Sequence, residues 1–168
     1  MKKQQRGPKS TVSVDTFRED PLQPKIARAV GKLLARGKVT TPVDLLVAMS
    51  LLQAAQVEDW RRGRVPYLDK VINCNLTRLS RLLLILRFHA HDLNVVPSVT
   101  ACMRWGKGPK QRLRFTKTGD PRLEEAYAGH FVWPGKGPFH PRASSKKHAG
   151  GGHIEQEVEL SLAKERGV

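Results

Sequence analysis

The sequence predicts a mainly α-helical protein with a small β-hairpin, an α+β fold. Two segments, residues 24–36 and 75–93, carry apolar residues at the spacing of one face of a helix. Two short alternating runs around a Gly-rich turn, near residues 99–117, predict the hairpin. We therefore expect a single folded helical domain over residues 21–133.

The first helix is expected from Pro24 to Arg36, with Gly37 as a left-handed cap at its end. Its buried stripe consists of Ile26, Val30, Leu33 and Leu34. Four basic residues cluster on the opposite side at helical spacing: Lys25, Arg28, Lys32 and Arg36. The helix therefore separates an apolar face from a basic face.

A second helix is expected to begin at Thr41-Pro42, because Thr suits the N-cap and Pro the first helical position, and to end at residues 49–52. A third short helix, residues 53–62, ends at Gly63. Two short helices joined by a brief turn are compatible with a helix-turn-helix. A further helix over residues 66–73 and the long helix over 75–93 follow. A winged-helix-like domain, with the hairpin as its wing, is one realisation of this order.

The hairpin is expected to pair Thr100–Trp105 with Arg112–Thr116. Strand alternation places Met103, Trp105, Leu113 and Phe115 on its core-facing side and Arg104, Arg112 and Arg114 on the other. A short helix, residues 121–128, follows the N-cap Asp120. Residues 130–133 predict a final apolar strand or docking segment.

The terminal segments have no regular apolar period. Residues 1–20 are interpreted as a flexible basic arm, 134–152 as a Gly/Pro-rich basic linker, and 153–168 as a short acidic-apolar segment that forms either a strand or a helix on binding. Residues 1–20 lack an apolar signal stretch, and the longest apolar run is Leu82–Leu86. We therefore expect no membrane association and a cytoplasmic protein.

The charge predicts the class of partner. Thirty Lys and Arg face 15 Asp and Glu, a formal charge of +15, and residues 99–147 alone hold 11 basic and 3 acidic residues. Such a chain favours a polyanion, and we expect non-enzymatic nucleic-acid binding through the phosphate backbone. DNA is slightly favoured by the helix-turn-helix, and an RNA-binding role in a ribonucleoprotein is the alternative. The expected contacts are Arg28, Lys32, Arg61, Arg62, Arg64, Arg104, Lys107, Lys110, Arg112, Arg114 and Lys136.

Other functions have less support in the sequence. The residues Trp60 and Tyr67, on either side of Gly63 and three arginines, are interpreted as core anchors of a turn. A small nuclease could combine His89 or His91 with His130 and an acid such as Asp120, although no spacing requires this. An adaptor that docks on an acidic protein through the same basic surface is a third alternative. The spacing of the histidines predicts no metal site, and no cofactor motif is present.

Overall fold

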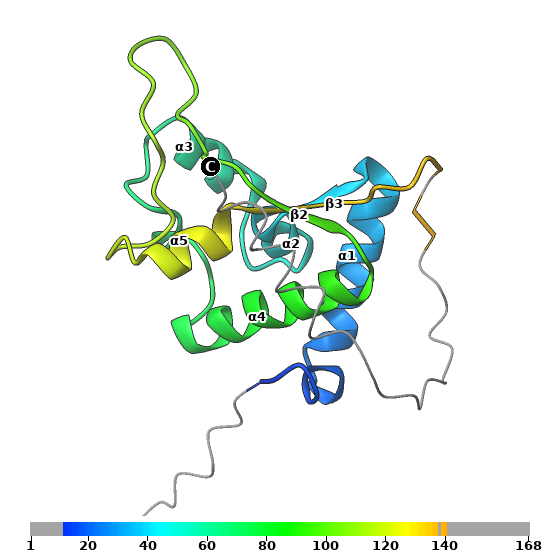
Figure 1. The fold of residues 1–168 in the computed structure, drawn as a ribbon. Coiled ribbons are helices and arrows are strands. Elements are labelled where there is room, and N and C mark those ends of the chain that lie inside the picture. Colours follow the sequence, from blue (N-terminus) through cyan, green and yellow to red (C-terminus); the bar gives the residue numbers. More distant parts are fainter. Residues whose placement is uncertain (1–11, 138, 141–168) are drawn as a thin grey trace, which may run out of the picture.

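The computed structural model describes residues 12–137 and 139–140. Over these residues the chain forms five α-helices, two short 3-10 helices and a three-stranded antiparallel sheet (Figure 1). The expected fold class, mainly α with a small amount of β structure, is confirmed.

Helix α1, Gln23–Gly37, matches the first predicted helix. Ile26, Val30 and Leu34 are completely buried, whereas the four basic residues of the opposite face are exposed. The cap differs from the prediction: Gly37 is the last helical residue, and Lys38 adopts the left-handed conformation with φ of 59°. The backbone N–H of Lys38 donates to the carbonyl of Leu34 at 2.9 Å, which satisfies one of the free carbonyls at the helix end.

Strand β1, Val39–Thr40, leads into helix α2, Pro42–Ala48. The hydroxyl of Thr41 accepts a hydrogen bond from the backbone N–H of Asp44 at 3.1 Å, which confirms the predicted N-cap. Helix α2 ends at Ala48 rather than within 49–52, because the chain turns at Ser50 with φ of 59°. Helix α3, Ala54–Arg61, follows, and the chain reverses at Gly63 with φ of 76°.

The expected helix over residues 66–73 is wrong: only a three-residue 3-10 helix, η2, Leu68–Lys70, forms there. The long helix is present as α4, Leu76–Asp92, and Asn75 caps it by accepting a hydrogen bond from the backbone N–H of Arg78 at 2.8 Å. Its buried residues are Leu79, Leu82, Leu83, Ile85, Leu86 and Ala90. Leu76, one of the apolar residues that predicted this helix over 75–93, is 63% exposed in its first turn.

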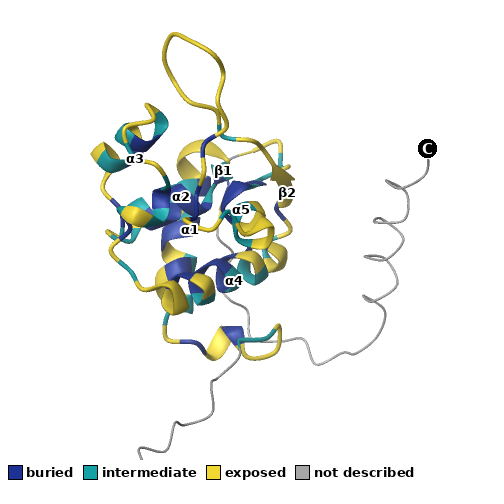
Figure 2. Ribbon diagram, turned by 90° about the vertical axis from the view of Figure 1, so that its left-hand side faces the viewer, coloured by how far each residue is buried: buried dark blue, intermediate teal, exposed yellow. Residues whose placement is uncertain are grey.

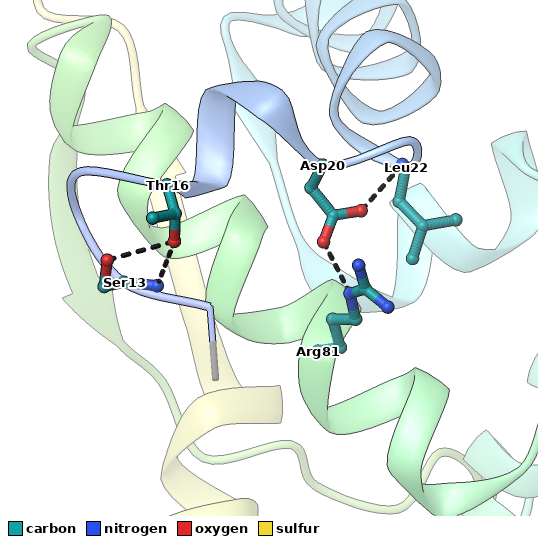
Figure 3. Close-up of polar contacts among 5 residues, drawn as sticks. All are labelled: Ser13, Thr16, Asp20, Leu22 and Arg81. Carbon is teal, nitrogen blue, oxygen red and sulfur yellow. Dashed lines mark hydrogen bonds and ion pairs between the residues drawn. The ribbon is translucent and has the colours of Figure 1, made fainter. Parts of the chain in front are cut away.

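Residues 12–20 pack on α4, although they were expected to belong to a flexible arm. The 3-10 helix η1, Phe17–Glu19, buries Phe17 completely, with its ring centroid 5.5 Å from that of Phe88. The buried carboxylate of Asp20 accepts from the backbone N–H of Leu22 at 2.8 Å and pairs with the Arg81 guanidinium (Figure 3). This part of the predicted arm therefore belongs to the folded domain, and residues 1–11 lie outside the described residues.

Strands β2, Val96–Val99, and β3, Gly129–Val132, complete the sheet in the order β1-β3-β2. Val132 pairs with both Val39 and Val96, so β3 is the central strand and confirms the expected final strand. The predicted hairpin strands are absent, and a single bridge joins Met103 to Arg112 in their place. Strand β2 lies before the predicted hairpin. All four of its residues are exposed, so no alternation of buried and exposed positions marks it.

Helix α5, Pro121–Ala128, connects the 100–120 segment to β3. Its N-cap is the predicted one, because Asp120 accepts from the backbone N–H of Arg122 at 2.9 Å. Of the predicted linker, only residues 134–137, 139 and 140 are described, and the acidic-apolar segment 153–168 lies outside the described residues. Within the part of the chain that the structure describes, none of the helices is both long enough and apolar enough to cross a bilayer.

Candidate functional site

A long loop, residues 100–117, leaves the sheet after β2 and projects from the helical body (Figure 1). We call residues 103–112 the basic loop, because they include four basic residues and no acidic one: Arg104, Lys107, Lys110 and Arg112. All ten residues of this segment are exposed, as Figure 2 shows for the projecting loop, and the chain returns to the core at the next residue, Leu113. Gly106 and Gly108 turn its tip with φ of 112° and 117°, a conformation that side chains rarely adopt.

The returning limb of the loop is anchored in the core by an aromatic cluster. Phe115, only 3% exposed, lies between Trp60 of α3 and Tyr127 of α5, with ring centroids 5.0 and 5.2 Å away. The indole N–H of Trp60 donates to the carbonyl of Arg114 at 2.7 Å. This confirms the core-anchor interpretation of Trp60 and fixes one end of the basic loop against two helices.

Polar contacts hold the same limb. The Glu124 carboxylate accepts from the backbone N–H groups of Phe115 and Thr116, the latter at 2.8 Å. The Tyr127 hydroxyl donates to Asp69. Burial raises the pKa of the Asp69 carboxyl, the hydrogen bond from Tyr127 opposes that shift, and the charge of Glu124 adds to it. Burial, followed by the contact with Asp69, also raises the pKa of Tyr127.

The outgoing limb carries the main error in the predicted site. Met103 and Trp105, expected to face the core, are 38% and 51% exposed. The backbone N–H of Trp105 donates to the carbonyl of Arg61 at 2.7 Å, and the Arg61 guanidinium stacks over the indole ring, 4.8 Å from its centroid. Because one bridge alone joins the two limbs, strand alternation does not set the direction of these side chains. For Trp105, the stack with Arg61 sets the direction of the side chain.

Trp105 and Arg61 line a cleft of about 560 Å³ between α1, α2 and α3. Three basic side chains come from two helices: Lys32 and Arg36 from α1, and Arg61 from α3. The remaining lining residues are the acids Asp44 and Glu58 and the apolar residues Leu33, Val47, Ala48, Ala54 and Val57. The cleft therefore combines an aromatic surface, apolar walls and a group of cations.

The structure brings part of the predicted contact set together. Lys32 and Arg61 lie in the cleft, and Arg28 occupies the exposed face of α1 one turn before Lys32. Arg104, Lys107, Lys110 and Arg112 belong to the basic loop that begins beside Trp105. Arg36 and Trp105 were missed as contacts. Arg36 was already visible in the basic stripe of the first helix, whereas nothing in the sequence marked Trp105 as exposed.

Four of the predicted contact residues do not join the cleft and have other partners or positions. Arg62 pairs with Glu58 at 2.6 Å and Arg64 with Asp59 at 2.9 Å, so carboxylates of α3 already neutralise both. Arg114 donates to the carbonyl of Lys117 at 2.6 Å and so closes a turn. Lys136 belongs to the segment after β3, which lies on the opposite side of the molecule from the basic loop (Figure 1). None of these four joins the cleft.

The basic side chains of the α1 face and the basic loop differ from these arginines. Among residues 12–137 and 139–140, the ion pairs involve Arg18, Arg62, Arg64 and Arg81. Within that part of the chain, no carboxylate pairs with a cation of the α1 face or the loop. These cations are therefore exposed and charged, as contact with phosphate requires.

The residues of the alternative nuclease site lie on different elements and in different environments. His91 is exposed, whereas burial lowers the pKa of His89 two positions earlier on α4. Asp120 serves as a helix cap, and His130 lies on β3 with its Nδ1 3.0 Å from the carbonyl oxygen of Ala128. Among the described residues, no three His, Cys, Asp or Glu side chains lie close enough together to hold a metal ion.

Comparison of the chain with protein-family models, with curated proteins and with solved structures finds no match. The chemistry of the cleft and the basic loop is therefore the basis for a functional proposal.

Proposed function

We propose that this protein binds nucleic acid through the α1 face, the cleft and the basic loop. The observation that carries the proposal is the meeting of Lys32 and Arg36 of α1 with the stacked pair of Arg61 and Trp105. These groups come from three separate parts of the chain. Exposed cations beside an exposed aromatic ring suit a polymer that offers both phosphates and bases.

The anchoring of the loop supports this proposal. The aromatic cluster around Phe115 and the contact of Trp105 with Arg61 hold both limbs, while the tip with Lys107 and Lys110 stays exposed. A loop held at its base presents its charges in a defined place, so less conformational entropy is lost on binding than for a free chain. The cations of the α1 face extend the same charged surface along a rigid helix.

The slight preference for DNA depends on a possible helix-turn-helix formed by the second and third helices. Helices α2 and α3 do follow one another after a five-residue connection, residues 49–53. On helix α3, the second helix of this pair, Glu58 and Asp59 hold Arg62 and Arg64 in ion pairs, so these two arginines are less available for contact with phosphate. We therefore propose backbone contact by the loop and α1, and we leave the choice between DNA and RNA to the binding experiment. A winged-helix-like docking and a cytoplasmic location remain predictions.

The test is a titration of fluorescent single strands and duplexes, DNA and RNA, at salt concentrations between about 50 and 200 mM. Binding should weaken steeply as salt rises. A loop variant neutralises exposed cations of the basic loop: Lys107→Gln, Lys110→Gln and Arg112→Gln. A control variant removes the same charge far from the loop: Arg78→Gln, Arg87→Gln and Lys136→Gln, all exposed in the structure.

The loop variant should flatten the slope of log affinity against log salt by about 0.9 per lost duplex contact, or about 0.7 per lost single-strand contact. The control variant should leave the slope nearly unchanged. Equal effects of the two variants would show that binding depends on the net charge of the protein and not on the basic loop. Absence of binding to every nucleic acid at low salt would overturn the proposal, and tight binding of poly-glutamate instead would favour the adaptor alternative.

A further inference from the structure

We propose that the cleft receives an unpaired base of single-stranded nucleic acid, so that the protein prefers single strands to duplexes. This inference rests on the proposed function and specifies the form of nucleic acid that the site accepts. The cleft volume of about 560 Å³ falls within the range of ligand sites, about 300–1,000 Å³. Its apolar walls, formed in part by Leu33, Val47 and Val57, suit the flat face of a base.

Trp105 supplies the stacking surface. Half of its side chain is exposed, although its backbone N–H and its ring are both fixed by Arg61. A tryptophan exposed in this way costs free energy through its contact with water, and the arginine stack holds it in one orientation. An indole or guanidinium plane of this kind stacks on bases of any sequence, because every base has a π-face.

The charges around the cleft are arranged for a nucleotide rather than for an isolated apolar ligand. Lys32 and Arg36 follow one another along the exposed side of α1 and can contact the phosphates on either side of the bound base. Asp44 and Glu58 lie among the same lining residues. Glu58 already pairs with Arg62, and Asp44 accepts from the Thr41 hydroxyl at 2.8 Å, so the remaining lone pairs of these two carboxylates are what can accept hydrogen bonds from base amino groups.

A duplex fits this cleft poorly. Its bases are paired and stacked, and extrusion of one base costs several kcal/mol, whereas a single strand pays little of that cost. DNA and RNA single strands share the chemistry that the cleft recognises, a planar base next to phosphates. The inference therefore concerns the single-stranded form, and separate titrations with oligo-dT and oligo-U distinguish the two sugars.

The first test compares single strands of about 12 nucleotides with a duplex of the same length, using Trp105→Ala and Trp105→Phe. The Ala variant should bind single strands about tenfold more weakly, whereas the Phe variant should lose less because it keeps an aromatic face. Duplex affinity should change less than twofold for both. Because Trp105 is half exposed, both variants should keep the fold, and far-ultraviolet circular dichroism checks this.

A second test uses two neighbouring alanines of α3 that are both exposed. Ala54 lines the cleft and Ala55 does not, so Ala54→Glu and Ala55→Glu have the same net charge and differ in position alone. The Ala54→Glu variant should bind single strands at least fivefold more weakly than the Ala55→Glu variant. Their duplex affinities should agree within twofold.

These outcomes separate the inference from the proposed function. Equal affinity of the natural protein for single strands and duplexes, with Trp105→Ala weakening both alike, would overturn the cleft inference while nucleic-acid binding stands. Equal single-strand affinities of the two alanine variants would overturn it as well. Failure to bind either form at low salt would instead refute the proposed function.

Discussion

Trp60 on α3 donates its indole N–H to the backbone carbonyl of Arg114, 54 residues later, at 2.7 Å. The ring of Trp60 is 1% exposed and packs on Phe115, so one side chain provides both an apolar anchor and a polar bond. The same carbonyl also accepts from the backbone N–H of Leu68 at 3.2 Å. The carbonyl of Arg114 therefore joins the returning limb of the loop both to α3 and to the segment at Leu68.

Replacement of Trp60 by Phe should lower the free energy of unfolding by about 2 kcal/mol. The variant loses the indole bond to the Arg114 carbonyl and leaves a small cavity beside Phe115. Urea denaturation followed by circular dichroism measures this change. A variant as stable as the natural protein would show that the bond contributes nothing to the fold.

Substitution of Gly63 by Ala should destabilise the protein by about 1 kcal/mol or more. Gly63 has φ of 76°, and an added Cβ would lie 3.0 Å from Cδ of Arg104. The matched control is Gly37→Ala at the end of α1, where an added Cβ meets nothing within 4 Å. That control should be neutral or slightly stabilising, since Ala favours helix. Equal melting temperatures of the two variants would contradict this explanation.

Glu124→Gln should destabilise the protein by about 1–2 kcal/mol, because the Glu124 carboxylate accepts from two backbone N–H groups and from the Thr116 hydroxyl. Its neighbour Glu125 is exposed on the same helix and serves as the control. Glu125→Gln should change stability by less than about 0.5 kcal/mol. Thermal unfolding of the two variants side by side measures the difference, and a larger loss for Glu125→Gln would contradict the assignment.

The protein should become less stable as the pH falls, because the partly buried His89 resists protonation in the folded state. Burial lowers the pKa of His89 from 6.5, Asp92 opposes the shift and Arg18 adds to it. The unfolded chain therefore takes up a proton first as the pH falls below about 6.5, which favours unfolding. In His89→Gln this contribution disappears, so the variant should lose less stability than the natural protein between pH 7.5 and 5.5. Equal losses in denaturant titrations at the two pH values would refute the assignment.

Much of the helical framework could be predicted because it depends on local patterns. Apolar spacing located α1 and α4, and the N-caps Thr41 and Asp120 marked the starts of α2 and α5. The sheet could not be placed in the same way. Strand β1 has two residues, and β2 is exposed throughout, so the pairing of β2 with β3 depends on tertiary contacts between residues 30 to 36 positions apart.

The candidate site was predictable in its charge and not in its geometry. The basic face of α1 follows from helical spacing, and the pairing of Glu58 with Arg62 four residues later was open to the same argument. The pairing of Asp59 with Arg64 crosses a helix end and the turn at Gly63. The exposure of Trp105 depends on its stack with Arg61, a contact between residues 44 positions apart, so sequence alternation pointed to the wrong face.

The most direct measurement follows the indole N–H signals of the three tryptophans in an NMR titration with a single-stranded oligonucleotide at low salt. The signal of Trp105 should shift or broaden strongly, together with the backbone amides of the basic loop and of residues near Lys32 and Arg36. The signals of Trp60, bonded within the core, and of Trp133, after β3, should change little. Binding that leaves the Trp105 signal unchanged, or that shifts Trp133 instead, would contradict the interface at the cleft and the basic loop.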